Sequence, residues 1–517
     1  MRLVLVLIAL SLSALGCSSL PRAADSQKNA SFALEHPQET KLGRQFLDES
    51  QRRDGESGFH ILSAGIDGFL TRVQLARAAE RTLDLQYFIF RGDTTGRLLS
   101  EELQRAADRG VRVRILVDDG DTVAGDEQIL ELGRHPNVEV RVFNPFDYRG
   151  HNGFLRHMDF LFHEGRLDYR MHNKLMVADN AVALIGGRNV GNQYFQVDPG
   201  SQFADDDVFA AGEIAQRLSK TFDEYWNSEL AVPSTALPLP EARPTPAPPL
   251  SFHGSGVDYE ARVASGQPYR ALVSDAAALT WSRAEVVCDS PDKKDVVHKK
   301  TSGHLMAREV TEAIAGAREE LLMVTPYFVP SDGELALLDR LRAQSVRLRI
   351  LSNSLESAPE LAAQSGYSKF RVQLLEAGIE LYEVRARLER TRGSGQTRTV
   401  SRYGTYGLHA KLYVIDRRRL YIGSMNYDQR SLRINTEVGL IIDSRTLAEQ
   451  TAERFENMVS PQEAYEVTLR PGTGRPKLVW DTEIDHQRLE LTREPSRGLW
   501  QREKVKILSM LPIDREL

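Results

Sequence analysis

The chain has 517 residues, which is long enough for two or three domains that each bury a core of their own. Its apolar content of 41% and charged content of 27% are ordinary for a globular protein. The formal net charge of −6 argues against a general nucleic-acid binder, because such proteins usually carry a surplus of basic residues. A local basic groove is still compatible with this charge.

The N-terminal segment, residues 1–17, has the layout of a signal peptide. Arg2 precedes an apolar run, Leu3–Leu12, which is too short to span a bilayer. Gly16-Cys17 resembles the end of a bacterial lipoprotein signal, with Cys17 as the lipidated residue; ordinary secretion with cleavage nearby is the alternative. The serine after Cys17 resembles the class sorted to the outer membrane. We therefore expect a lipid-anchored protein on the periplasmic side of a bacterial cell envelope, at the outer membrane rather than the inner one.

The rest of the chain divides by composition. A stretch that is polar and irregular, apart from a short helical patch near Thr40–Asp48, follows the signal and predicts a tether at 18–58. Seven prolines in a later segment predict a semi-rigid extended linker. The boundaries that we expect are 59–232 for a first domain, 233–250 for the linker, 251–470 for a second domain and 471–517 for a C-terminal extension.

Both domains show the same alternation of helical and strand patterns. In the first we expect a helix at 66–79, a strand at 83–90, a helix at 96–109 and a strand at 111–117. In the second we expect a helix at 307–317, a strand at 321–329, a helix at 333–343 and a strand at 346–351. This rhythm predicts parallel strands with helices on the faces of a sheet. Val111 and Val346, which start matching strands, are 235 positions apart, and this offset indicates an internal duplication.

A pattern of histidine, lysine, aspartate and a Gly-x-x-Asn block occurs twice, 237 positions apart. The first copy consists of His172, Lys174, Asp179 and Gly186-Gly187-Arg188-Asn189. The second consists of His409, Lys411, Asp416 and Gly423-Ser424-Met425-Asn426. Apolar β-formers fill the intervals, so each copy predicts a strand, an aspartate-led turn and a second strand. Residues two apart in a strand face the same side, so each histidine should project beside its lysine. One His-x-Lys occurs by chance in most chains of this length, whereas two complete copies indicate a shared function.

The doubled pattern resembles the HxKx4Dx6G(S/G)xN motif of the phospholipase D superfamily, with Gly187 in the first copy where the second has Ser424. The strings Arg170–Lys174 and Thr325–Pro330, together with the C-terminal tail, resemble the lipoprotein-like C-type branch of bacterial cardiolipin synthases. The resemblance covers roughly residues 60–230 and 305–517. It implies an α/β fold of two duplicated domains, each a mixed sheet flanked by helices, related by a pseudo-two-fold axis and sharing one active site.

Cleavage of a phosphodiester through a covalent intermediate needs a nucleophile, an acid for the leaving alkoxide, and cations for the phosphate oxygens. The residue types alone allow the two histidines to exchange the first two roles. The resemblance implies that His172 becomes the phosphohistidine and that His409 acts as acid and then as base. It also implies that the phosphate is bound by Lys174, Lys411, Asn189, Asn426 and Ser424.

Four carboxylates are candidates for supporting roles. Asp179 and Asp416 belong to the motif and to the expected catalytic set, but they follow their lysines by five residues, where capping a turn is an equally good interpretation. Asp205 and Glu437 lie 33 and 28 residues after their histidines, where the superfamily carries an acidic residue that orients a catalytic imidazole. For Asp205, within the run Asp205–Asp207, an exposed acidic turn is the alternative.

The function that we expect is phosphatidyl transfer on membrane phospholipids, with hydrolysis to phosphatidic acid or a periplasmic nuclease as alternatives. We expect no cofactor and no nucleic-acid partner. We expect no metal ion either, because the histidines lack ligand spacing and the neighbouring lysines would repel a cation. An arginine-rich piece, residues 385–406, fits either a solvated loop or a flap over an anionic substrate. The sequence does not determine the oligomeric state.

Overall fold

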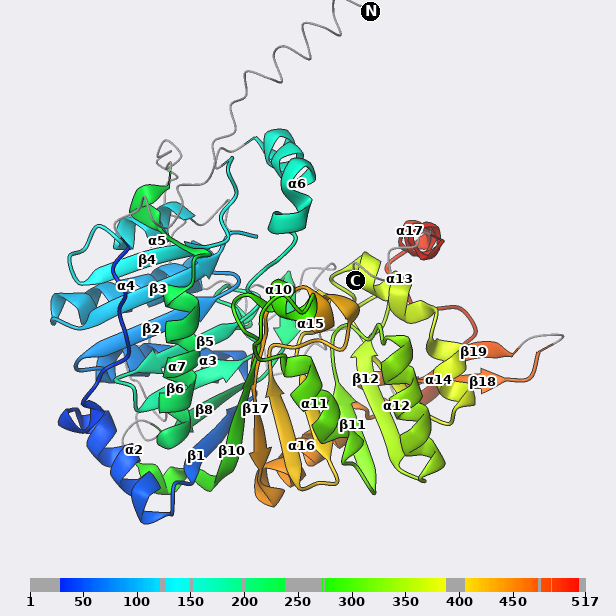
Figure 1. The fold of residues 1–517 in the computed structure, drawn as a ribbon. Helices are drawn as coiled ribbons and strands as arrows, with labels where there is room; N and C mark the ends of the chain where they lie inside the picture. Colours follow the sequence, from blue (N-terminus) through cyan, green and yellow to red (C-terminus); the bar gives the residue numbers. More distant parts are fainter. Residues whose placement is uncertain are drawn as a thin grey trace, which may run out of the picture.

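The structure is a computed structural model, and it describes residues 28–120, 126–148, 152–197, 200–237, 272, 275–386, 405–472, 476–484 and 486–510. Two α/β halves lie side by side, and their sheets join into one sheet of 18 strands (Figure 1). Pairing places the strands in the spatial order β9-β4-β3-β2-β5-β6-β8-β1-β10-β17-β16-β15-β11-β12-β13-β18-β19-β20. Counted outward from the β1–β10 junction, the strands of the two halves correspond one to one, as far as β9 in the first half and β18 in the second. The predicted duplication and the predicted α/β class are confirmed.

The first half begins with a short 3-10 helix and a helix that precede its sheet. Its elements are η1 (Pro37–Glu39), α2 (Lys41–Arg52), β1 (Ser57–Leu62), α3 (Gly65–Ala78), β2 (Thr82–Tyr87), α4 (Thr94–Asp108), β3 (Arg112–Asp118), α5 (Asp126–Leu132), β4 (Val138–Phe143), α6 (Gly153–Leu167), β5 (Lys174–Ala178), β6 (Val182–Gly186), β7 (Ser201–Ala204), β8 (Asp207–Ala211), α7 (Glu213–Asn227), β9 (Ala231–Pro233) and η3 (Ser234–Ala236). Strands β2, β3 and β4 are parallel to one another, and β5, β6 and β8 follow β2 in the sheet, each antiparallel to the strand before it.

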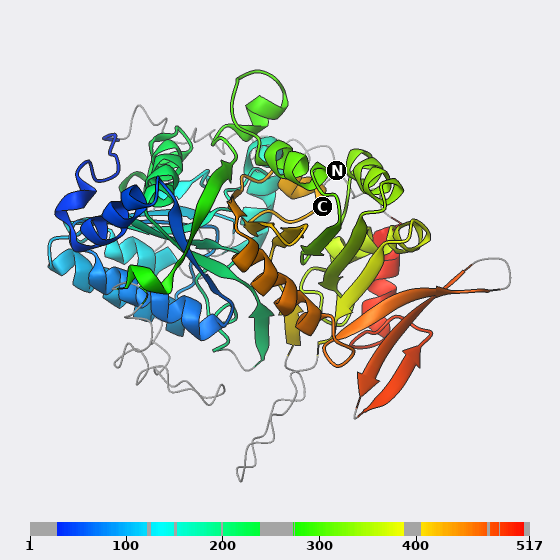
Figure 2. The same cartoon turned by 90° about the horizontal axis from the view of Figure 1, so that it is seen from below.

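The second half repeats this plan and adds three elements after it. Its elements are η4 (Ala276–Ala278), β10 (Thr280–Cys288), α10 (Lys293–Val297), α11 (Met306–Ala315), β11 (Glu320–Val324), α12 (Asp332–Ala343), β12 (Arg347–Asn353), α13 (Leu361–Ser368), α14 (Arg371–Glu376), β13 (Glu380–Val384), β14 (Thr405–Leu408), β15 (Leu412–Ile415), β16 (Arg419–Gly423), α15 (Gln429–Arg433), β17 (Val438–Asp443), α16 (Arg445–Met458), β18 (Ala464–Arg470), β19 (Lys477–Ile484), β20 (Gln487–Leu491) and α17 (Leu499–Ser509). Figure 2 shows β18–β20 extending outward from the edge of this half.

Six of the eight helices and strands predicted for the two halves agree with the structure to within two residues at each end. The two exceptions are strands that end early. The strand predicted at 83–90 leaves the sheet after Tyr87, and the one predicted at 321–329 ends at Val324. Proline at 326 explains the second, because it lacks the N–H that a ladder needs. After the first of these strands, Phe88 contacts the ring of His172.

Both motif segments fold as the predicted hairpins. Strand β5 pairs with β6 and β15 pairs with β16, each antiparallel. The two turn residues of each hairpin have positive φ, 51° at Asp179 and Asn180, and 52° and 50° at Asp416 and Arg417. Such angles at both central positions match the right-handed twist of the strands, and Asp and Asn tolerate them best.

The two halves share a core and a continuous seam. Strand β1 pairs with β10, and β7 pairs in parallel with β14. One hydrophobic cluster draws buried side chains from both halves, among them Phe59, Leu175, Leu322 and Leu412. Two tyrosine hydroxyls of the first half donate across this seam, Tyr225 to the Asp289 carbonyl at 2.7 Å and Tyr169 to the Pro291 carbonyl at 2.8 Å. The halves therefore form one folding unit in which their motif ends are fixed against each other.

The chain segments outside the two cores differ in part from the expected boundaries. The described part of the expected tether, residues 28–58, packs on the first half: Thr40 caps α2, and Phe46 of α2 is fully buried. The tether prediction is wrong for this part: the helical patch expected near Thr40–Asp48 is part of α2, and its buried Leu42, Phe46 and Leu47 hold it against the first half. Residues 231–233 continue the first half as β9. The signal peptide, most of the linker and most of the arginine-rich piece lie outside the described residues. Among the described helices, none is long and apolar enough to cross a membrane.

Candidate active site

His172 lies just before β5 and is held by the other half of the molecule. Its Nδ1 lies 2.9 Å from Oε2 and 3.1 Å from Oε1 of Glu437, which immediately precedes β17. Its backbone N–H donates to the carbonyl of Thr436 at 2.9 Å, so backbone and ring are both fixed by the segment that precedes β17. With Nδ1 engaged by a carboxylate, Nε2 is left as the nitrogen that can react.

His409 lies just before β15 in the mirror arrangement. Its Nδ1 lies 2.6 Å from Oδ2 of Asp205, which follows β7. Its backbone N–H donates to the carbonyl of Ala204 at 2.8 Å. Only 7% of each histidine is exposed, while both carboxylates are fully buried.

The two histidine–carboxylate pairs are therefore crossed between the halves. Each imidazole comes from one half of the molecule and its orienting carboxylate from the other half. The sequence predicted both carboxylates, and the structure brings both to the histidines. The sequence spacing could not show which carboxylate serves which ring. Because neither half contains a complete histidine–carboxylate pair, the site exists only when the two halves are packed together.

The two motif lysines lie beside their histidines, as predicted. Lys174 Nζ donates to the His172 carbonyl at 2.5 Å, and Lys411 Nζ lies 3.0 Å from Nδ1 and 3.3 Å from Nε2 of His409. Burial and the lysine charges lower the pKa of His172 well below its usual value, and that of His409 to about 3. Burial also lowers the pKa of Lys411 to about 8. Without an anion between the lysines, both imidazoles are therefore neutral.

The two orienting carboxylates differ in charge behaviour. Burial raises the pKa of Glu437 to about 7. For Asp205 the cost of burial is outweighed by His409 and Lys411, and its pKa is lowered. His409 therefore faces a carboxylate that stays ionised, whereas His172 faces one that titrates near neutrality. An ionised neighbour favours the imidazolium form, so His409 is better placed to carry a proton once an anion enters.

The Gly/Ser variation between the two motif copies follows from these carboxylates. At Gly187 an added Cβ would lie 2.1 Å from Oδ1 of Asp205, so only glycine fits. At the matching position, the Ser424 hydroxyl donates to Oε2 of Glu437 at 2.5 Å. The Asp205 carboxylate thus fills the space that a side chain at position 187 would need. At the matching position of the second half, the Ser424 side chain holds Glu437 by a hydrogen bond.

The two motif asparagines, both predicted to bind the phosphate, have different surroundings. Asn189 accepts from the backbone N–H of Ile89 and donates to the Tyr194 hydroxyl, so its amide holds the segment after β2. The buried Oδ1 of Asn426 has no hydrogen-bond partner within the described structure.

Asp179 and Asp416 lie in the hairpin turns at the far ends of β5 and β15 from the histidines. Each accepts three backbone N–H groups, from residues 80–82 and 318–320 respectively. This placement favours the turn-capping interpretation over a direct role in catalysis.

Aromatic rings form walls that the sequence reasoning did not identify. Phe88 lies edge-on to His172 with ring centroids 5.1 Å apart. Phe203 stacks on His409 at 5.3 Å, and Tyr194 meets the same ring edge-on at 5.2 Å. The early end of the strand at Tyr87 is what brings Phe88 to the site. Rings on these sides exclude water and restrict how each imidazole can turn.

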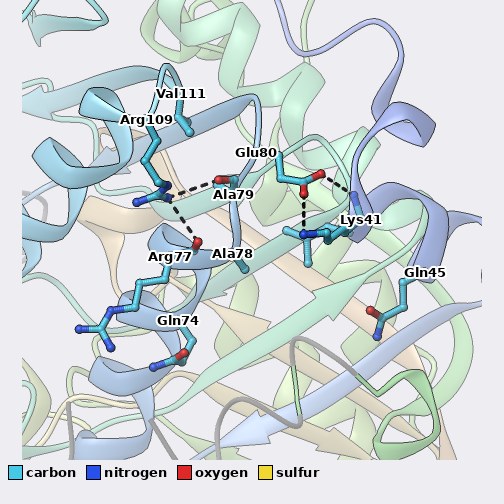
Figure 3. A pocket seen from close by; sticks show the side chains of 10 residues that line it. Lys41, Gln45, Gln74, Arg77, Ala78, Ala79, Glu80, Arg109 and Val111 are labelled. Atoms are coloured by element: carbon cyan, nitrogen blue, oxygen red, sulfur yellow. Dashed lines mark hydrogen bonds and ion pairs between the residues drawn. The ribbon is translucent and has the colours of Figure 1, made fainter. Parts of the chain in front are cut away.

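A separate surface hollow lies between α2, α3 and the start of β3, at the opposite end of β2 from the histidines (Figure 3). Its charged groups already have partners: Lys41 pairs with Glu80 at 3.2 Å, and Arg109 donates to backbone carbonyls of α3 and its C-cap. We assign no chemistry to it.

Comparisons with known proteins agree with this geometry. The sequence matches the family described as "Cardiolipin synthase, PLD-like domain" twice, over residues 73–226 and 310–459. It is 33% identical to cardiolipin synthase C of Escherichia coli over 480 residues, which cover 92% of this chain and 99% of that protein. It is 26% identical to cardiolipin synthase A of Pseudomonas entomophila, over 78% of this chain and 67% of that protein.

Among solved structures, phosphatidylserine synthase of Haemophilus influenzae has a similar fold, with a TM-score of 0.53 and 14% identity over 81% of this chain and 91% of that one. Two matches to one domain family, each containing one histidine–lysine motif, confirm the family and the duplication predicted from the sequence. The chain belongs to the phospholipase D-like family of the cardiolipin synthases.

Proposed function

We propose that the protein is a phosphatidyltransferase that moves a phosphatidyl group from one membrane phospholipid to the hydroxyl group of another, as a cardiolipin synthase does. The observation that carries the proposal is the pair of crossed histidine–carboxylate contacts with a lysine beside each ring. This arrangement supplies two imidazoles and two cations to one phosphodiester. The match to cardiolipin synthase C over nearly the whole of both chains supports a phospholipid as that diester.

In the first step the phosphodiester binds between the two lysines. Its negative charge offsets theirs and raises the pKa of His409, which then takes up a proton beside ionised Asp205. Neutral His172 attacks phosphorus through Nε2 while Glu437 accepts a hydrogen bond from Nδ1–H. The phosphorus–oxygen bond to the leaving alcohol breaks, and His409 gives its proton to that oxygen. General acid help of this kind is typically worth about 10²–10⁴ in rate.

In the second step the released alcohol is replaced by the hydroxyl of the acceptor lipid. Neutral His409 removes the proton of that hydroxyl as its oxygen attacks phosphorus. The phosphorus–nitrogen bond to His172 breaks and leaves that ring neutral. His409 then holds the acceptor's proton, as it held one when the phosphodiester first bound, and releases it when the product leaves. Water in place of the acceptor would give phosphatidic acid. The 7% exposure of each histidine and the aromatic walls favour transfer over hydrolysis, because they limit the access of water.

The test is to incubate the purified protein with vesicles of phosphatidylglycerol, with and without phosphatidylethanolamine, and to identify the products by mass spectrometry. Transfer predicts a product with two phosphates and four acyl chains, together with a free headgroup alcohol. Phosphatidic acid as the sole product would establish hydrolysis instead. Cleavage of a DNA oligonucleotide with no action on lipid would establish the nuclease alternative. The His172→Ala protein is the matched control.

We further propose that Cys17 carries a lipid anchor that holds the enzyme at the periplasmic side of the envelope, at the outer membrane. The motif Gly16-Cys17 after the apolar run supports this, and an anchor at that position would keep the enzyme at the surface of its substrate. The Cys17→Ala protein should be unacylated and should leave the membrane fraction more readily. An unchanged acyl-labelling pattern in that variant would overturn the anchor proposal.

A further inference from the structure

Helix α6 is attached to the protein by its polar side. Arg156 and Asp159 bond to the backbone of the preceding loops, and Arg166 donates to Asn144 Oδ1 at 3.0 Å. His163 Nδ1 contacts Asp159 Oδ1 at 2.9 Å on the same side. Arg156, Asp159 and His163 are spaced by three or four positions, as one face of a helix requires, and Arg166 follows the kink at His163, where φ is −123°.

The opposite face of α6 is apolar and points outward. Phe154 is 69% exposed, Phe162 67%, and Leu155 and Leu161 44% and 52%. Together with Met158, these residues recur at the i, i+4, i+7 spacing that normally marks the buried face of a surface helix. In α6 the usual arrangement is inverted.

Helix α17, in the C-terminal extension, has the same character. It docks through Val505, which is 4% exposed, and through Gln501, whose Nε2 donates to the Leu355 carbonyl at 2.7 Å. Trp500 is 82% exposed and Ile507 is 61% exposed. Of the ten large apolar side chains exposed in the described part of the chain, eight lie on α6 or α17 or directly after α17. Such clustering marks an interaction surface, because single exposed apolar residues are normally scattered.

Short chain segments and hydrogen bonds link each helix to the segment that carries one active-site histidine. Helix α6 ends at Leu167, five residues before His172, and Asp168 after it pairs with Arg430 of α15 at 2.7 Å. Residue 355, which holds α17, lies two positions after Asn353, whose side chain bonds the backbone of Leu408 just before His409. In Figure 1, α6 and α17 stand at the same edge of the molecule, on either side of α15.

We propose that the outward faces of α6 and α17 insert into the interfacial layer of a phospholipid bilayer and set the active site against it. The proposal rests on the proposed function, because a lipid substrate must reach the histidines from a membrane surface. Charge favours an anionic bilayer: α17 carries Arg502, Lys504 and Lys506 against Glu503. Tryptophan beside lysine suits this layer, since the ring sits at the headgroup level and the lysines reach the phosphates.

The experiment uses the full-length chain with Cys17→Ala, so that no acyl group contributes to binding. Co-sedimentation is measured with vesicles of phosphatidylcholine and phosphatidylglycerol, and with phosphatidylcholine alone. The double variants Phe154→Ser/Phe162→Ser and Trp500→Ser/Ile507→Ser should each bind about tenfold more weakly or worse, because each deletes two large inserted side chains. Phe32→Ser is the matched control, since Phe32 is 63% exposed at the far end of β3 and should not affect binding.

A second readout places the tryptophan in the lipid. Brominated phospholipids should quench fluorescence in the starting protein and much less in a Trp500→Phe variant. The inactive His172→Ala protein should bind vesicles as the starting protein does, which separates this proposal from the proposed function. Equal vesicle binding by all variants would overturn the proposal. So would loss of self-association in the double variants without loss of vesicle binding, because the faces would then be an interface between copies of the chain.

Discussion

The two halves of the molecule share a strand order and a motif, yet they are not equivalent at the active site. In the first half, Gly187 leaves room for Asp205, which contacts His409 and stays ionised. In the second, Ser424 bonds to Glu437, which contacts His172 and has a pKa of about 7. A duplicated fold has thus given its two histidines different electrostatic surroundings. The difference assigns the nucleophile to the ring beside the neutralisable carboxylate and the acid to the ring beside the permanent charge.

The largest expected effect comes from removing either histidine. His172→Ala should lower kcat by about 10⁴-fold or more on any substrate, because no covalent intermediate can form. His409→Ala should lower it by about 10²–10⁴-fold on a natural phospholipid but far less on a p-nitrophenyl phosphodiester, whose leaving group needs no proton. The double variant should be no worse than His172→Ala, because the residues act as one unit. Equal sensitivity of both single variants to the leaving group would contradict the division of roles.

Exchanging the Gly/Ser pair tests the same asymmetry from the carboxylate side. Gly187→Ser should displace Asp205 from His409 and lower kcat by about 100-fold, since its Cβ would fall 2.1 Å from Asp205 Oδ1. Ser424→Gly removes the hydrogen bond to Glu437 and the one that the hydroxyl accepts from the Val438 N–H, but it leaves Glu437 beside His172, so it should cost about tenfold. Steady-state kinetics on both variants, with thermal melts to confirm folding, measure the comparison. Equal losses would mean that the two positions are interchangeable.

The pH dependence should report Glu437 and not Asp205. With a p-nitrophenyl substrate, kcat/KM should fall about tenfold per pH unit below about 7, because protonated Glu437 no longer accepts the Nδ1 proton of His172. Asp205 has a lowered pKa, so it remains ionised there and adds no slope. Glu437→Gln should be slower and flat across this range, whereas Asp205→Asn should keep the slope. A slope that survives in Glu437→Gln would assign it to another group.

The smallest catalytic effects are expected at the motif aspartates. Asp179→Ala should lower the free energy of unfolding by about 2–3 kcal/mol, because three backbone N–H groups around a fully buried carboxylate lose their acceptor. Asp416→Ala should cost less, about 1 kcal/mol, because Asp416 is only partly buried and water can replace it. Denaturant unfolding measures both. In the folded protein kcat should stay within a few-fold of the starting value. A loss of kcat as large as that of the histidine variants would show that both aspartates take part in catalysis.

The sequence was sufficient for the fold class and for the residues at the centre of the site. Identical spacing in two copies of the motif predicted the hairpins, because apolar alternation and an aspartate-led turn are local signals. The crossing of Asp205 and Glu437 between halves could not be predicted, since it depends on how β7 packs beside β14. The place of Phe88 also depends on context, because a strand pattern does not show where a sheet stops hydrogen bonding. The apolar residues of α6 have the same spacing in the sequence as those of a buried helix face, so the sequence could not show that this face points outward.

The central claim is that one covalent site is assembled from both halves, with His172 as its nucleophile. Its most direct test is to trap the enzyme during turnover of a p-nitrophenyl phosphodiester, avoiding acid, and to locate the adduct by mass spectrometry. The account predicts a phosphodiester adduct on His172 in the starting protein and in His409→Ala, and none on either histidine in His172→Ala. An adduct on His409 in the His172→Ala protein, with none on His172 in the converse variant, would contradict it.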